Sequence, residues 1–265
     1  MEGPSRAGYN RSIVTSENDY LRALPPRLME RLSEDLQLVE FRRGRELTAA
    51  AVDGSIIFPI TAVFLFELDP AEGQPSFSWI ASSHNTLFGR RGDWEESTHY
   101  RLRTLQSGFA LVIDKEIFVH KLGQPDWAHF YNYFGGGWAL RILGLHATCL
   151  ATHAVPGRLA SMLLEAAHAF GPDRPIPITH AQFGRILAVR RESVTLALSA
   201  LVEQRLIALG HGRVSILDMD ALGQRSCPCH ASNRRTWSDL LDGWRSVWAE
   251  AERREGGSAP DAAGG

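Results

Sequence analysis

The run Arg190–Ser193 combines two guanidinium groups, a carboxylate and a hydroxyl. The guanidinium of Arg191 can donate two hydrogen bonds to the edge of a guanine, and the carboxylate of Glu192 can accept one from the amino group of a cytosine. Arg190 and Ser193 suit contacts to phosphate oxygens, which set register rather than read sequence. On many helices such a run is only a solvated face with local ion pairs, so the surrounding elements must decide between the two interpretations.

The flanking residues predict two short helices joined by a turn at 188–190. Thr179 is a good N-cap for the first helix, and Gln182 stands three residues later, where a capping box needs Glu or Gln. The second helix repeats apolar residues at helical spacing and so buries one face. Its opposite face begins with Arg191, Glu192 and Ser193 and carries Thr195. A helix divided in this way suits the major groove of DNA, with Thr195 as a third base-reading residue.

Two short apolar runs follow, at 206–209 and 214–217, and predict a hairpin. Helix, turn, helix and hairpin together predict a winged helix. His211 and Arg213 at the hairpin tip would lie along a phosphate backbone, and Thr179 is a further candidate phosphate contact. Five arginines and two acids between residues 178 and 213 give this stretch a local charge of +3, whereas the whole chain carries −2. Affinity for nucleic acid must therefore be concentrated on one face.

Residues 157–218 resemble the DNA-binding domain of the Crp/Fnr family of bacterial transcription regulators. The resemblance implies that Arg191 and Glu192 read base edges. Many members carry a second arginine later on the same helix, where this chain has Leu196, so no half-site sequence is predicted. The matching stretches are 158–160, 163–164, 178–179, 189–198, 206–207 and 213–218.

The first half of the chain is predicted to form a helix at 21–38, followed by strands and turns. Short strands with closely spaced turns suggest a small antiparallel barrel or jelly roll. The segments Ile57–Ile60 and Leu87–Gly89 resemble the Crp/Fnr sensor domain, a cyclic-nucleotide-binding fold. The expected class is therefore α+β, with an antiparallel barrel, a long dimerisation helix and a C-terminal winged helix-turn-helix. The expected strands are 37–41, 55–67, 77–80, 100–105 and 109–113.

The barrel departs from the family pattern where a cyclic nucleotide would bind. Gly89 is followed by Arg90 instead of an acid. Residues 95–99 stand where the family binds the phosphate, and they contain two glutamates and no arginine. Binding of cyclic AMP is therefore not expected, and the effector is unknown. Four arginines could hold another anion or be solvated strand and loop charges: Arg90, Arg91, Arg101 and Arg103.

Three cysteines, Cys149, Cys227 and Cys229, do not make a disulfide framework, and a reducing cytoplasm fits them. Cys227, Cys229 and His230 could ligate zinc, but the C-x-C spacing lacks a matching second pair. We therefore expect no metal site and no cofactor. A metal-dependent jelly-roll enzyme would need a His/His/Glu set, for which His84 and His99 are too isolated.

The stretch 126–153 predicts a long helix with an a/d seam. Its seam predicts a parallel homodimer, while Trp138, Ile142, Leu145 and Cys149 would face the barrel. Gly135–Gly137 departs from a good helix and predicts a flexing point. The predicted dimer seam contains Tyr133, Gly136, Leu140, Leu143, Ala147, Leu150 and Ala154.

The chain organisation follows from these segments. It is 44% hydrophobic and 22% charged, as in an ordinary globular protein, with no expected signal peptide or membrane span. We expect a cytoplasmic, non-enzymatic regulator with operator DNA, a second copy of the chain and RNA polymerase as candidate partners. The alternative is a barrel that binds a small molecule or metal, with a winged helix that contacts protein. The expected parts are 1–19 flexible N-terminus, 20–122 sensor barrel, 123–155 dimerisation helix, 156–225 winged helix, and 226–265 C-terminal helix (from 237) with a disordered end.

Overall fold

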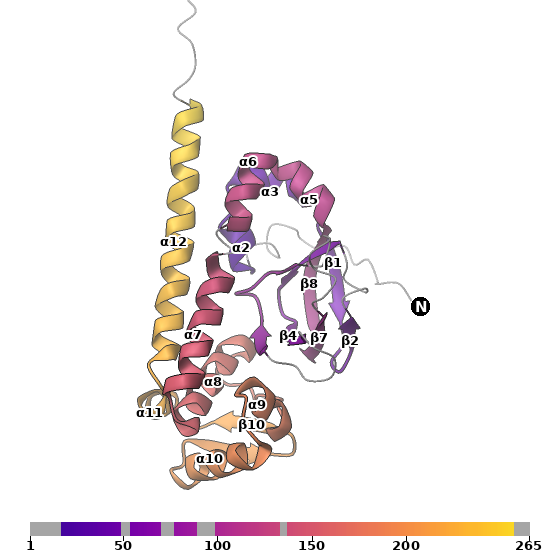
Figure 1. Ribbon diagram of the computed structural model, residues 1–265. Helices are drawn as coiled ribbons and strands as arrows, with labels where there is room; N and C mark the ends of the chain where they lie inside the picture. Colours follow the sequence, from indigo (N-terminus) through magenta and orange to yellow (C-terminus); the bar gives the residue numbers. More distant parts are fainter. Residues whose placement is uncertain (1–16, 49–53, 70–76, 89–98, 133–136, 257–265) are drawn as a thin grey trace, which may run out of the picture.

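The structure is a computed structural model that describes residues 17–48, 54–69, 77–88, 99–132 and 137–256. A barrel, a pair of long helices and a small α/β unit make up the molecule (Figure 1). The long helices α7 and α12 run beside the barrel, and the small C-terminal unit lies at one end of α7. No helix among these residues is long and apolar enough to cross a membrane.

Eight strands in the described residues form two four-stranded antiparallel sheets. The strand order is β1-β8-β3-β6 in one sheet and β2-β7-β4-β5 in the other, which confirms the predicted jelly-roll barrel. The strands are β1 Gln37–Phe41, β2 Glu46–Thr48, β3 Ser55–Pro59, β4 Val63–Asp69, β5 Phe77–Ala81, β6 Leu87–Phe88, β7 His99–Gln106 and β8 Gly108–Asp114.

The expected single strand at 55–67 is two strands, one in each sheet. The chain crosses between the sheets at Ile60–Ala62, where all three backbone N–H groups donate to the carbonyl oxygen of Phe109. A Cβ on Gly108 would lie 2.5 Å from backbone atoms of Thr61 and Ala62. Glycine therefore permits the close approach that lets one apolar run serve both sheets.

Short helices cover one end of the barrel: α2 Asp19–Arg22, α3 Pro26–Ser33, α5 Lys115–Leu122 and α6 Gln124–Phe130. The helix expected at 21–38 is wrong in extent, because Pro26 starts a new helix after α2 and residues 37–41 pair as β1. The flexible N-terminus expected for 1–19 is also too long. Asn18 is fully buried, caps α2, and donates its side-chain amide to the carbonyl oxygens of Pro59 and Asn85.

Helix α7 spans Trp138–Thr152. Tyr131 and Asn132, after α6, and Gly137, before α7, are π-helical. A Cβ on Gly137 would lie 2.9 Å from the carbonyl oxygen of Asn132, so glycine permits this close approach. π-Helical residues commonly mark kinks in helices. The long helix predicted for 126–153 is therefore divided into two, and Gly135 and Gly136 of the predicted flexing point lie outside the described residues.

Helix α12 spans Cys229–Gly256 and is much longer than the amphipathic segment expected from residue 237. It docks on the short helices of the barrel end through Leu241, Trp244 and Trp248, all buried. The Trp244 ring lies 5.8 Å from that of Phe130 and 5.0 Å from that of Trp248, in edge-to-face arrangements. The C-terminal helix is therefore part of the barrel core.

The C-terminal unit has the predicted order of helices and a two-stranded hairpin. Its core continues into the barrel, since Val63 and Leu65 of β4 belong to the same apolar cluster as Phe183 and Leu198. The elements are α8 Val155–Phe170, α9 His180–Ile186, α10 Arg191–Glu203, β9 Ile207–Gly210, β10 Arg213–Ile216 and α11 Met219–Arg225.

Candidate nucleic-acid interface

The start of α9 is fixed by the capping box that the sequence predicted. The hydroxyl oxygen of Thr179 accepts from the backbone N–H of Gln182 (3.3 Å), and the Gln182 side chain accepts from the backbone N–H of Thr179 (2.8 Å). Two helix-end donors are thereby satisfied within the motif itself. The box holds Thr179 in place at the exposed edge of the unit.

The turn between α9 and α10 depends on a close backbone approach at Gly184. The N–H of Val189 donates to the carbonyl oxygen of Gly184 (2.9 Å), and a Cβ on Gly184 would lie 2.9 Å from the carbonyl oxygen of Val189. Ala188 adopts a left-handed conformation with φ of 50°. This turn sets the angle at which α10 leaves the unit, and any side chain larger than hydrogen at residue 184 would disturb it.

Helix α10 buries one face and exposes the other, as predicted. Val194 and Leu198 are fully buried, whereas Arg191, Glu192 and Thr195 are exposed. Glu192 lies in the first turn, where its negative charge suits the helix dipole. The three predicted base-reading residues therefore share the solvent side of one helix.

The side chain of Thr195 is already engaged within the protein. Its hydroxyl donates to the carbonyl oxygen of Arg191 (3.1 Å) and lies 3.1 Å from Nδ1 of His180. The methyl group of Thr195 is therefore the part best placed for an apolar contact. Sequence reasoning missed His180, which α9 brings against α10; its place directly after the N-cap Thr179 was the signal for it.

A surface hollow joins the two helices to the hairpin. The strands β9 and β10 pair in register from Ile207–Ile216 to Gly210–Arg213, which leaves a two-residue turn. The hollow has a volume of about 490 Å³, and Thr179, Arg191, His211 and Arg213 line it together with His180. Four residues predicted to contact DNA thus face one concave surface that carries positive charge.

The remaining predicted contacts lie beside this hollow. Arg190 is the N-cap of α10 and makes no side-chain cap hydrogen bond, and its side chain is exposed. Ser193 is half-buried, and its backbone N–H donates to the carbonyl oxygen of Arg190 (3.1 Å). Leu196 is 74% exposed on the same helix. An exposed leucine at that point offers apolar contact where an arginine would offer hydrogen bonds.

Helix α9 is also attached to the barrel. Nε of Arg185 lies 3.2 Å from a carboxylate oxygen of Glu67, whose side chain in β4 is only 2% exposed. The paired strands β4 and β5 bring this sheet against α9 and α8. The position of the helix-turn-helix is therefore tied to the barrel by a buried charge and a shared core.

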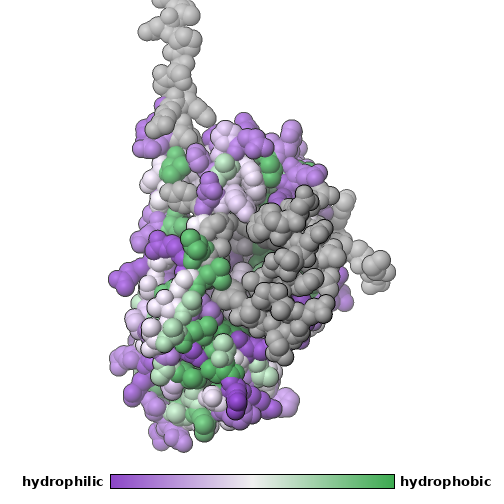
Figure 2. Space-filling model, viewed as in Figure 1, coloured by the Kyte–Doolittle hydropathy of each residue, from purple (hydrophilic) through white to green (hydrophobic). Residues whose placement is uncertain are grey.

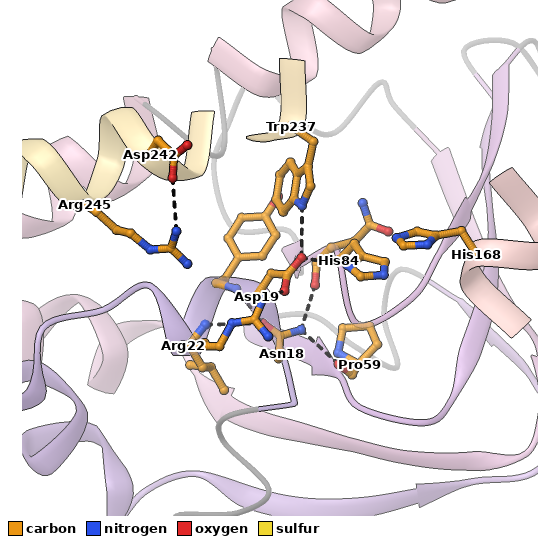
Figure 3. A network of polar contacts seen from close by, with 12 residues as sticks. Asn18, Asp19, Arg22, Pro59, His84, His168, Trp237, Asp242 and Arg245 are labelled. Atoms are coloured by element: carbon orange, nitrogen blue, oxygen red, sulfur yellow. Dashed lines mark hydrogen bonds and ion pairs between the residues drawn. The ribbon is translucent and has the colours of Figure 1, made fainter. Parts of the chain in front are cut away.

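A polar network connects the other end of the barrel to α8 and α12 (Figure 3). Asp19 accepts a hydrogen bond from Nε1 of Trp237 (3.0 Å) and lies 2.6 Å from Nδ1 of His84. Burial alone would raise the pKa of Asp19, but hydrogen bonds from His84 and Trp237 and the charge of Arg22 lower it overall. The His84 ring stacks on His168 of α8 at 4.0 Å. His84 therefore has partners on α2 and α8 and lies in the same polar junction as Trp237 of α12.

Leu140, Leu143 and Ala147 of the predicted seam are exposed on α7, whereas Leu150 lines the same cavity as Leu145 and Cys149. Leu140 is 74% exposed and Leu143 is 43% exposed, while Ala147 is exposed and Leu150 is half-buried. Hydrophobic side chains gather over the α7 and α8 region in Figure 2. Leu145 and Cys149 line the opposite side, which faces the barrel as expected. Tyr133 and Gly136 of the predicted seam lie outside the described residues.

Of the four arginines considered for an anion in the barrel, two lie outside the described residues, Arg101 is half-buried on β7, and Arg103 is paired. Arg90 and Arg91 lie outside the described residues, as do Gly89 and 95–98. Arg103 on β7 donates to the carboxylate of Glu46 on β2 (3.0 Å). Since β2 and β7 are paired neighbours, this is a cross-strand ion pair.

The three cysteines come together at the junction of α7, α8 and α12. Cys149 and Cys227, whose sulfurs are in contact, are 78 residues apart in the sequence. The sulfur atoms of all three lie within 4.8 Å of one another. Burial raises the pKa of Cys149. Burial also disfavours the Cys227 thiolate, but hydrogen bonds from Ser161 and the backbone of Cys229 lower the Cys227 pKa overall. Spacing alone missed this cluster, because its third thiol comes from a distant helix.

Comparison with known proteins agrees with this geometry. Residues 157–225 match the family model of the Crp-like helix-turn-helix domain. No curated protein sequence matches the chain. The fold resembles that of many solved structures. The three described next have low sequence identity to this chain.

Three of these structures illustrate the likeness. A transcriptional regulator assigned to the Crp/Fnr family from Eubacterium rectale has a TM-score of 0.58 at 17% identity, covering 77% of this chain and 95% of that one. FixK2 from Bradyrhizobium japonicum has a TM-score of 0.54 at 15% identity, covering 72% and 98%. The c-di-GMP-responsive regulator CLP of Xanthomonas campestris has a TM-score of 0.52 at 16% identity, covering 72% and 98%. The predicted Crp/Fnr resemblance and fold class are confirmed.

Proposed function

We propose that this chain, with its Crp-like helix-turn-helix domain and Crp/Fnr-type fold, is a cytoplasmic, sequence-specific transcription regulator that binds a two-fold DNA site as a homodimer. The hollow between α9, α10 and the wing carries the proposal, because it gathers Thr179, Arg191, His211 and Arg213 on one exposed surface. Groups that suit phosphates and a group that suits a base edge thus face the same side.

In this proposal α10 enters the major groove with its first turn foremost. Arg191 donates two hydrogen bonds to a guanine, and Glu192 accepts one from a cytosine. The methyl group of Thr195 and the exposed side chain of Leu196 suit apolar contact with thymine methyls. The side chains along the wing and around the turn contact phosphates and fix the register: Thr179, Arg190, Ser193, His211 and Arg213.

The exposed seam supports the homodimer. Leu140 and Leu143, three residues apart on α7, are 74% and 43% exposed. Apolar side chains are costly to leave in water. A parallel pairing of α7 helices would present two recognition helices to half-sites about 34–36 Å apart. RNA polymerase is a candidate partner of such a complex. The barrel's signal is not cyclic AMP in this proposal.

The test is selection of bound sequences from a random DNA pool, followed by affinity measurements on the enriched site. Arg191→Ala should lose about 5- to 150-fold in affinity and relax specificity at one position of each half-site. Arg225→Ala is the matched control, because Arg225 is an exposed arginine at the end of α11 and its loss changes net charge equally. Equal losses in both variants, or no enriched sequence, would contradict base reading by α10.

A second variant separates phosphate contact from base reading. Arg213→Ala should weaken binding to all sequences alike and reduce the slope of log affinity against log salt by about one. Its sequence preference should remain that of the unmodified protein. A change in preference with an unchanged salt slope would place Arg213 at a base instead.

The dimer is tested by placing charge on the seam. Leu140→Asp combined with Leu143→Asp should shift the sedimentation coefficient from dimer to monomer and abolish preference for a two-fold site over a single half-site. Leu217→Asp is the control, since Leu217 is 61% exposed but lies outside α7. A seam variant that remains dimeric would show that another surface mediates assembly.

A further inference from the structure

All three cysteines of the chain meet where α7, α8 and α12 converge. Cys149 lies in the last turns of α7, Cys227 lies between α11 and α12, and Cys229 is the first residue of α12. The sulfurs of Cys149 and Cys227 are 3.6 Å apart, and all three lie within 4.8 Å of one another. In the described residues this is the one such group of potential metal ligands.

We propose that these three thiols form a binding site for a thiophilic divalent metal ion of the Zn²⁺ type. Zn–S bonds are about 2.3 Å long, so a tetrahedral ion holds its sulfurs roughly 3.8 Å apart. The Cys149–Cys227 separation of 3.6 Å already agrees with this spacing. The widest pair needs to close by at most about 1 Å, which side-chain rotation provides. Thiolate ligands favour zinc and softer ions over magnesium or calcium.

The backbone around Cys227 is held in place before any ion binds. Its N–H donates to the carbonyl oxygen of Gly157 (3.1 Å) in the first turn of α8. The Ser161 hydroxyl donates to the carbonyl oxygen of Cys227 (3.1 Å) and lies 3.0 Å from its sulfur. Hydrogen bonds to ligands and their neighbours orient a metal site and strengthen its affinity. Cys227 is the buried, well-anchored member, and Cys149 and Cys229 complete the group from two helices.

A cavity of about 180 Å³ gives access to the cluster. Cys149 and Cys229 line it, as do His146, one turn earlier on α7, and His230, directly after Cys229. Because both imidazoles line this cavity, each is a candidate for the fourth ligand of a tetrahedral ion. His230 is oriented by Glu165, whose carboxylate lies 2.7 Å from its Nδ1.

A buried positive charge lies on the wall of the same cavity. Arg158 is 6% exposed, and its guanidinium donates to the carbonyl oxygens of Leu150 (3.2 Å) and Leu187 (2.7 Å). Three thiolates around a divalent ion leave one net negative charge, which a neighbouring arginine stabilises in a poorly hydrated site. The cavity therefore suits an anionic metal–thiolate centre.

The site would connect separate parts of the chain. Cys149 belongs to the proposed dimerisation helix, Cys227 is bonded to the first turn of the DNA-binding unit, and Cys229 begins the helix that docks on the barrel. An ion bound by all three fixes these parts relative to one another. This step rests on the proposed function. Binding of the ion would change the angle at which α10 meets DNA.

The experiment titrates Co²⁺, as a spectroscopic substitute for Zn²⁺, into the reduced 265-residue chain without DNA. We expect one ion per chain, with thiolate-to-cobalt charge-transfer absorption and the visible bands of a tetrahedral site, all displaced by Zn²⁺. Each of Cys149→Ser, Cys227→Ser and Cys229→Ser should weaken binding by more than about 100-fold, since even outer partners contribute 10- to 100-fold. Circular dichroism checks that each variant is folded.

His146→Ala and His230→Ala identify the fourth ligand, with His120→Ala on α5 as the control. The variant that lacks the ligand should shift the visible bands and keep the charge-transfer absorption. Absence of charge-transfer absorption in the reduced protein would overturn the proposal, as would absorption unchanged in any single cysteine variant. A Cys149–Cys227 disulfide formed in air, with no Co²⁺ bound after reduction, would overturn it in favour of a redox pair. Since the readout needs no DNA, its outcome is separate from that of the DNA selection.

Discussion

The surface that we propose to face DNA and the barrel junctions use polar residues in opposite ways. Arg191 and Arg213 are exposed around an open hollow, where water can satisfy their hydrogen bonds. Glu67 and Asp19 are 2% and 5% exposed and reach partners on helices far away in sequence. Removing an exposed group costs little stability, whereas removing one partner of a buried charge leaves the other desolvated. Substitution of the proposed recognition residues should therefore leave stability almost unchanged. Substitution of a junction residue should lower it.

The largest expected effect is at the junction between α12 and the barrel end. Trp244→Ala should lower the free energy of unfolding by about 3–5 kcal/mol, because Trp244 is fully buried and packs on Phe130 and Trp248. Urea denaturation followed by circular dichroism measures this change. Arg245→Ala, at the exposed neighbouring position, should stay within about 0.5 kcal/mol. A similar small loss for Trp244→Ala would mean that α12 is not part of the barrel core.

A smaller effect is expected where α9 meets the barrel. Arg185→Ala leaves the buried carboxylate of Glu67 without its ion pair and should lower the free energy of unfolding by about 1–3 kcal/mol. Arg185 is itself 41% exposed, so the loss is less than for a fully buried pair.

The double variant Glu67→Gln with Arg185→Ala is the matched control for this junction. It should recover part of the lost stability, because an uncharged amide is cheaper to bury than an unpaired carboxylate. Arg191→Ala, also an arginine at the helix-turn-helix but exposed, should leave unfolding unchanged. Additive losses in the double variant would show that the two side chains do not interact.

The same contrast explains which features the sequence could predict. The capping box of Thr179 and Gln182, the turn and the buried face of α10 depend on residues within a few positions of one another, so local spacing reveals them. The barrel strands follow from short apolar runs between turns. The division of 55–67 between two sheets depends on pairing of β3 with β8 and of β4 with β7. No local pattern specifies these partners or their registers.

Contacts between distant segments were the ones that sequence reasoning missed. Asp19 meets Trp237 across 218 residues, and Cys149 meets Cys227 across 78. Asn18 and Asp19 belong to a polar stretch that predicts flexibility, yet a buried site for each exists only once the barrel and α12 have formed. A polar residue's role at a junction is therefore set by the fold that surrounds it.

The smallest expected effect concerns pH at the network of Figure 3. Burial of the His168 ring, together with the nearby charges of His84 and Arg234, lowers the pKa of His168 to about 4, from an ordinary value of 6.5. Arg234 donates to Nε2 of His168, which requires the neutral ring. Between pH 6.5 and 4 the unfolded chain therefore binds a proton at this residue that the folded chain does not bind.

The free energy of unfolding should accordingly fall as pH decreases from 6.5 to 4, and this contribution should level off below pH 4. The free energy of unfolding should change by less than about 1.4 kcal/mol per pH unit, because the His168 ring is partly exposed. His168→Asn, which can still accept from Arg234, should remove this part of the pH dependence. His120→Asn, at an exposed position of α5, should retain it. Urea denaturation at about pH 7, 6, 5 and 4 measures the pH dependence of unfolding for both variants. An identical pH profile in His168→Asn and the unmodified protein would show that the network stabilises the junction through packing, and that the histidine pair contributes no proton linkage.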